Sequence, residues 1–134
     1  MMEKFKILLE EFDELNISKG DYVIFGSGPI AVRGIKDVND LDVLVLPEKF
    51  EELKEKYKQD TSKHPFGCIE IGDIEIGESW QGDKEKVKEW IEAAEEYEGH
   101  MYMPLENVLE WKKKMGRPKD LKDVELVEKW LDKL

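Results

Sequence analysis

The chain has 134 residues, a length typical of one domain, and we expect residues 1–134 to form a single domain. Its formal net charge of −11 and its two arginines give no basic cluster, which argues against a protein that binds bare nucleic acid. A lone cysteine, Cys68, excludes an intramolecular disulfide. Because no signal peptide or membrane-spanning stretch is evident, we expect a cytoplasmic protein.

Hydrophobic periodicity and turn residues predict helices that alternate with a few short strands. The expected elements are a helix over 2–16, a strand over 22–26, a short helix start over 27–34, a strand over 41–46, a helix over 47–60, a loop over 61–65, a hairpin over 66–78, a helix from about 83 to 96, a strand or loop over 100–104, a helix over 105–116 and a helix over 117–134. This order predicts an α/β (α+β) fold, with a small mixed β-sheet of four to five strands flanked by helices.

Two aspartates at the start of the second apolar strand point to a functional site. Side chains alternate across a strand, so Asp40 and Asp42 face the same side. Two like charges in an apolar strand are costly unless a cation compensates them, and carboxylate oxygens favour Mg²⁺ or Mn²⁺. The alternative is that Asp40 caps a turn and Asp42 lies in water at the edge of the sheet.

The turn after the first strand, Gly26-Ser27-Gly28, is suited to hold a phosphate. Glycines let the backbone approach a ligand, and the N–H groups and the Ser27 hydroxyl supply donors. The stretch matches neither the Rossmann glycine pattern nor a Walker loop.

The combination of Gly26-Ser27 with Asp40-Leu41-Asp42 in an apolar strand resembles the signature of the DNA polymerase β-type nucleotidyltransferase superfamily. The resemblance implies a nucleotidyltransferase-like core in which the Gly-Ser turn holds a triphosphate and three acids bind metal ions. It implies a third acid in a nearby apolar strand, for which we choose Glu75, with Glu70 as the alternative. Both glutamates have an ordinary explanation as the solvent side of an alternating hairpin.

A second resemblance covers the C-terminal segment, which looks like the tail of small nucleotidyltransferase-like proteins, including the AbiEii-type toxins. The matching residues are Lys112, Gly116, Arg117, Lys119, Asp120 and Asp123. The resemblance implies that Lys112, Arg117 or Lys119 contacts phosphates. The alternative is that the two aspartates cap the last helix.

Together these features predict a metal-dependent nucleotidyltransferase that moves a nucleoside monophosphate from an NTP to a hydroxyl acceptor. Catalysis and metal binding are assigned to Asp40, Asp42 and Glu75, with Mg²⁺ or Mn²⁺ as cofactor. The acceptor is left open among a tRNA, a protein and a small molecule, and a homodimer or a small helical partner protein is left open as well. The alternative function is a non-catalytic protein of the same fold that binds a nucleotide or, as in toxin–antitoxin pairs, a partner protein.

Overall fold

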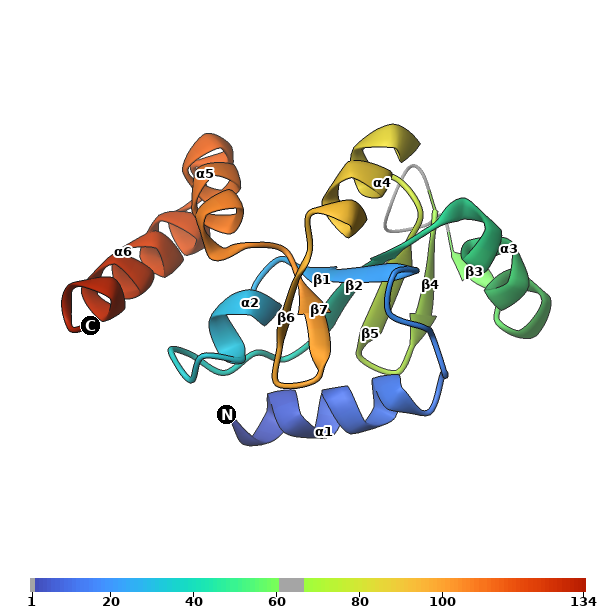
Figure 1. The fold of residues 1–134 in the computed structure, drawn as a ribbon, viewed down its shortest axis with the longest axis horizontal. Coiled ribbons are helices and arrows are strands. Elements are labelled where there is room, and N and C mark those ends of the chain that lie inside the picture. Colours follow the sequence, from blue (N-terminus) through green and yellow to red (C-terminus); the bar gives the residue numbers. More distant parts are fainter. Residues whose placement is uncertain (1, 61–66) are drawn as a thin grey trace.

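A computed structural model describes residues 2–60 and 67–134 of the chain, and within these residues seven strands form one mixed sheet in the order β3-β4-β5-β2-β1-β7-β6 (Figure 1). The strands are β1 (Tyr22–Phe25), β2 (Leu41–Val45), β3 (Gln59–Asp60), β4 (Cys68–Ile71), β5 (Ile74–Gly77), β6 (Glu95–Tyr97) and β7 (His100–Tyr102). The helices are α1 (Glu3–Asp13), α2 (Gly28–Ala31), α3 (Pro47–Lys56), α4 (Lys84–Glu92), α5 (Leu105–Met115) and α6 (Pro118–Asp132).

The middle of the sheet brings the expected site strands together. Strand β2 runs antiparallel to β1 and parallel to β5, and β4 pairs with β5 on the other side. In this register Asp42 lies opposite Phe25 on β1 and opposite Glu75 on β5.

The two faces of the sheet carry two separate apolar clusters. Along β2, Leu41, Val43 and Val45 point to the face covered by α1, whereas Leu44 points to the face where α4, α5 and α6 pack (Figure 1). Since side chains alternate, Asp42 points to the second face together with Leu44. The carboxylates therefore lie on the side of the sheet that the C-terminal helices cover.

The predicted fold class is confirmed, but the strand count of four to five was too low. The segment expected to be helical over 83–96 ends its helix at Glu92 and continues as strand β6. A two-residue turn at Glu98-Gly99, both with positive φ (47° and 91°), pairs β6 with β7. The glutamates of this segment suit a helix, and strand pairing overrides that preference.

The other missing strand is β3, which has two residues and lies where the helix over 47–60 was expected to continue. The helix itself ends at Lys56.

Gly116 ends α5 in the left-handed conformation, with φ of 63°, as is typical of a glycine that caps the C-terminus of a helix. The loop expected over 61–65 and the first residue of the hairpin lie outside the described residues.

Candidate active site

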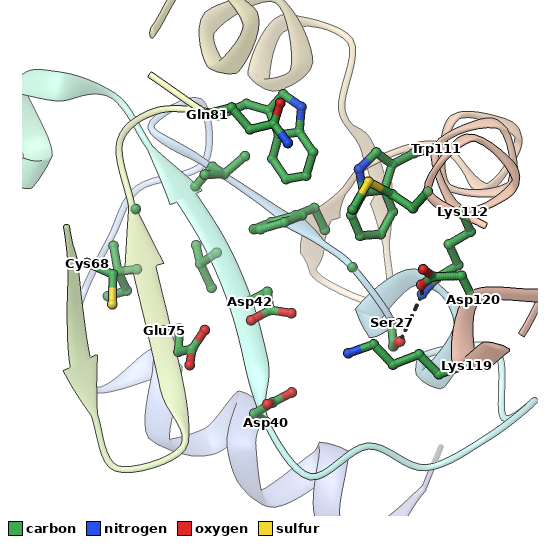
Figure 2. A pocket seen from close by; sticks show the side chains of 18 of the residues that line it. Ser27, Asp40, Asp42, Cys68, Glu75, Gln81, Trp111, Lys112, Lys119 and Asp120 are labelled. Carbon is green, nitrogen blue, oxygen red and sulfur yellow. Dashed lines mark hydrogen bonds and ion pairs between the residues drawn. The ribbon is translucent and has the colours of Figure 1, made fainter. Parts of the chain in front are cut away.

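A cavity of about 740 Å³ opens between the sheet and the two C-terminal helices (Figure 2). Strands β1, β2 and β5 form one wall, and α5, α6 and the turn between them form the other. Of the candidate residues, those that line the cavity are Gly26, Ser27, Asp40, Asp42, Glu75, Lys112, Arg117 and Lys119. The fold thus brings the motif around Gly26–Asp42 and the C-terminal motif around Lys112–Lys119, which are far apart in the sequence, to the same cavity.

The three expected acids converge on one side of this cavity (Figure 2). Asp40 immediately precedes β2, and Asp42 and Glu75 are neighbours on parallel strands. Burial raises the pKa of Asp42 to about 7, and the charges of Asp40 and Glu75 and a hydrogen bond with Glu75 act in the same direction. Burial and the two neighbouring acids thus favour the protonated form of Asp42, an effect that a bound cation would oppose.

Glu70 lies directly opposite Glu75 on β4, so the two alternatives for the third acid face the same side of the sheet. Glu75 lines the cavity and adjoins Asp42, whereas Glu70 is one strand further from β2 and is not among the lining residues. The geometry favours Glu75.

The two glycines of the phosphate turn have different reasons to be glycine. Gly26 has φ of 66°, and a Cβ there would lie 2.7 Å from Asp42 Oδ2, so the backbone approaches the carboxylate closely. Gly28 is buried, does not line the cavity, and a Cβ there would lie 2.4 Å from Ile24 Cγ2. Packing under α2 therefore accounts for the absence of a side chain at Gly28, and its predicted nucleotide contact stays a prediction.

Lys112 is buried at the edge of the cavity, with 4% of its surface exposed. Its Nζ lies 3.0 Å from Asp123 Oδ2 and 3.7 Å from Asp120 Oδ1, and it donates a 3.4 Å hydrogen bond to Ser27 Oγ (Figure 2). Lys36, which sequence reasoning missed, lines the same cavity and donates to Asp123 Oδ1 at 2.6 Å. Both ammonium groups are thus neutralised by aspartates of α6.

Arg117 and Lys119 differ in their pairing. The Arg117 guanidinium binds Asp120 through two hydrogen bonds, of 2.5 Å from Nε and 3.2 Å from Nη2. Lys119 makes no ion pair with any described residue, and its side chain reaches into the cavity beside Ser27 (Figure 2). Of the three cations expected to contact phosphates, Lys119 is the one whose charge is available.

No family model and no curated protein sequence matches the chain. Among solved structures, the chain is similar to a crystal structure of a "putative nucleotidyltransferase" from Thermotoga maritima, with a TM-score of 0.54 and 22% identity. The match covers 96% of this chain and 92% of that one. The chain has a nucleotidyltransferase fold. The similarity of the tail to AbiEii-type proteins stays a prediction.

The acids of this nucleotidyltransferase fold suit a divalent cation by their chemistry. Asp40, Asp42 and Glu75 supply hard oxygen donors, and the raised pKa of Asp42 indicates an electrostatic cost that a cation would relieve. Among the described residues, no three His, Cys, Asp or Glu side chains stand close enough together to enclose a metal ion. The donor types are those that Mg²⁺ and Mn²⁺ prefer, but the described residues form no ready-made coordination shell.

The part of the cavity away from the acids and Lys119 is lined by aromatic side chains rather than charged ones (Figure 2). The Trp80 ring meets those of Trp111 and Phe25 edge to face, with centroid distances of 5.3 and 6.1 Å. Both tryptophans line the cavity. Helical spacing could not reveal that Trp111 faces the cavity.

In the described part of the chain, no helix is long and apolar enough to span a membrane.

Proposed function

We propose that this chain is a metal-dependent nucleotidyltransferase that moves a nucleoside monophosphate from an NTP to a hydroxyl acceptor. One observation carries the proposal: Asp40, Asp42 and Glu75 share a cavity with the Gly26-Ser27 turn and with Lys119. Acids, a glycine turn and a cation side by side are the parts that phosphoryl transfer requires. The fold shared with the Thermotoga maritima protein supports the same class of reaction.

The charge of the cavity supports the requirement for metal. Four cationic and five anionic side chains line it: Lys36, Lys112, Arg117 and Lys119 on one hand, and Asp40, Asp42, Glu75, Asp120 and Asp123 on the other. A triphosphate would add several negative charges to a lining in which the acids balance the cations even when Asp42 is protonated. Bound at Asp40, Asp42 and Glu75, Mg²⁺ or Mn²⁺ would neutralise phosphate oxygens and stabilise the transition state. We therefore expect nucleotide binding to require the metal.

The remaining groups are assigned by position. Backbone N–H groups at Gly26 and Ser27 and the Lys119 ammonium would bind the triphosphate. The acceptor oxygen attacks the α-phosphorus, the bond from this phosphorus to the β-bridging oxygen breaks, and pyrophosphate leaves. Glu75 would accept the proton of the attacking hydroxyl, directly or through water. The aromatic half, with Trp80 and Trp111, is of a kind that binds a flat ring.

A thermal unfolding series tests the proposal. The wild type and the Asp40→Asn/Asp42→Asn variant are heated with each of the four NTPs, with and without Mg²⁺ or Mn²⁺. Ligand at a hundredfold excess over its dissociation constant stabilises the folded state by about 2.7 kcal/mol. We expect a metal-dependent rise of the midpoint in the wild type that is absent in the variant. No rise with any nucleotide at millimolar concentration would contradict the proposal.

The second candidate is a non-catalytic protein of the same fold that binds a nucleotide or a partner protein. The observation that favours it is the pairing of Lys112 and Arg117 with Asp120 and Asp123, which leaves fewer cations for the phosphates of a substrate. Incubation with radiolabelled NTP separates the two candidates. Metal-dependent binding without label transfer to RNA, protein or aminoglycoside acceptors would favour the second.

A further inference from the structure

Asp123 is a buried carboxylate that gathers side chains from three other parts of the chain. It lies on α6 and is 3% exposed. It accepts hydrogen bonds from Lys36 Nζ at 2.6 Å and from Ser27 Oγ at 3.3 Å, and Lys112 Nζ lies 3.0 Å away. Ser27 precedes α2, Lys36 lies between α2 and β2, and Lys112 lies on α5. One carboxylate thus ties the phosphate turn to both C-terminal helices.

The contacts of Asp123 disfavour a role as a ligand of phosphate or of metal. A carboxylate repels phosphate, and the two ammonium groups within about 3 Å of its oxygens disfavour a bound cation. Its three partners, however, all line the cavity. Asp123 lines the cavity as well, but its oxygens face these partners, so we expect it to act on a bound nucleotide chiefly through them.

The hydroxyl of Ser27 has a single proton, and the structure directs it to Asp123 while Lys112 donates to the same oxygen. A serine held from both sides cannot donate that proton to a phosphate as well. The backbone N–H groups of the turn are left as its phosphate donors. The position of these N–H groups then depends on the hydrogen bond between the Ser27 side chain and Asp123.

We propose that Asp123 is a positioning residue of the nucleotide site: it anchors Ser27 and orients Lys36 and Lys112 so that the turn is pre-organised for the triphosphate. The inference rests on the proposed function, because the ligand concerned is the NTP. Pre-organisation raises affinity by removing the cost of ordering these groups when the ligand binds.

The test measures the dissociation constant of the protein for Mg²⁺–NTP by titration calorimetry at 25 °C. The NTP used is the one that stabilises the wild type most. We expect Asp123→Asn to weaken binding about tenfold or more, because it loses charged hydrogen bonds to three groups. Glu125→Gln, on the same helix but in an exposed ion pair with Lys129, should bind like the wild type. Asp123→Glu, which retains the charge, should recover part of the affinity.

A double-mutant cycle with Ser27→Ala separates positioning from simple support of the fold. If Asp123 acts through Ser27, Asp123→Asn should weaken binding by a smaller factor in the Ser27→Ala background than in the wild type. An equal factor in both backgrounds would overturn the proposal, as would unchanged affinity of Asp123→Asn. Either result would leave the proposed function standing if the wild type binds. A wild type that binds no NTP would overturn both.

A comparison of two further variants keeps the test decisive if Asp123→Asn does not fold. Lys36→Met/Asp123→Asn removes both members of an ion pair, so the net charge of the cavity is unchanged, and Lys112 keeps Asp120 as a partner. We expect the double variant to bind more weakly than Lys36→Met, because Ser27 and Lys112 have lost their anchor. Equal affinity of these two variants would overturn the proposal.

Discussion

Gly26 and Asp42 leave no room for a side chain between them: a Cβ on Gly26 would lie 2.7 Å from Asp42 Oδ2. The phosphate turn and the central carboxylate are therefore in direct contact across β1 and β2, whose register places Phe25 opposite Asp42. A side chain at position 26 must therefore displace the Asp42 carboxylate, which is expected to bind metal.

Gly26→Ala should abolish the metal-dependent stabilisation by NTP while leaving the protein folded. The positive φ of 66° costs an alanine about 1 kcal/mol, and the new methyl group pushes away the Asp42 carboxylate. Gly34→Ala is a matched control, because Gly34 has φ of 76° and a Cβ there would meet nothing within 4 Å. Thermal unfolding with and without ligand measures both variants. Equal ligand responses in the two would contradict the prediction.

The pH dependence of stability should carry the signature of Asp42. Its pKa is about 7 in the folded protein, raised chiefly by burial, against 3.8 as the ordinary value. Between these values the folded state binds more protons than the unfolded state, so the free energy of unfolding falls as pH rises from about 4 to about 7. Asp42→Asn lacks this component. Urea unfolding of the metal-free proteins across this range measures the difference, and parallel profiles would refute the assignment.

Glu75 and Glu70 should separate clearly when each is changed to glutamine. Glu75→Gln removes an acid next to Asp42 and should lower nucleotide transfer by about a hundredfold or more. Glu70→Gln should retain most of the activity, because Glu70 lies one strand further from β2. Initial rates of label transfer under saturating Mg²⁺–NTP decide between them. Greater loss in Glu70→Gln would reverse the choice of third acid.

Lys119 should contribute to nucleotide affinity without contributing to stability. Because it makes no ion pair with a described residue and reaches into the cavity, Lys119→Met should weaken NTP binding about tenfold and leave the unfolding midpoint unchanged. Lys122→Met, at an exposed position one turn along α6, provides the control. Titration calorimetry measures both, and identical affinities would show that Lys119 does not contact the phosphates.

Lys112 should behave in the opposite way and support the fold. Lys112→Met leaves Asp120 and Asp123 buried without its charge, which should lower the free energy of unfolding by about 3 kcal/mol. Lys113→Met removes only an exposed pair with Glu128 and should cost about 0.5 kcal/mol or less. Urea denaturation compares the two. A similar small loss in both would mean that Lys112 is not part of the buried network.

Local sequence marked two acids and the turn as candidates, because Asp40 and Asp42 stand out in an apolar strand and Gly26-Ser27 follows the preceding strand. The third acid, Glu75, was chosen only from the family resemblance. Neighbouring residues in the sequence could not predict whether Lys112 contacts a phosphate or an aspartate. Its partner Ser27 is 85 residues away, and Lys36 meets Asp123 across 87 residues of chain. Lys36 also lies in a stretch without periodicity, so no pattern marked it.

The same distinction explains the secondary structure. Helices with a regular apolar stripe, such as α1 and α5, were predicted within a few residues of their observed ends. Strand β6 was not predicted, because Glu95 and Glu96 favour a helix and the strand exists only through pairing with β7. Pairing partners depend on the whole topology and not on the segment itself.

The anchoring of Ser27 by Asp123 joins residues 96 positions apart, and this has a consequence for the newly made protein. The turn and all three acids leave the ribosome well before α6, since synthesis proceeds from the N-terminus. Until α6 emerges and docks, neither Asp120 nor Asp123 can hold the cations of the cavity. Under the proposed function, a nascent or truncated chain lacking α6 would carry the three acids without Lys119 or the Asp123 anchor, so nucleotide binding would begin only after α6 has docked.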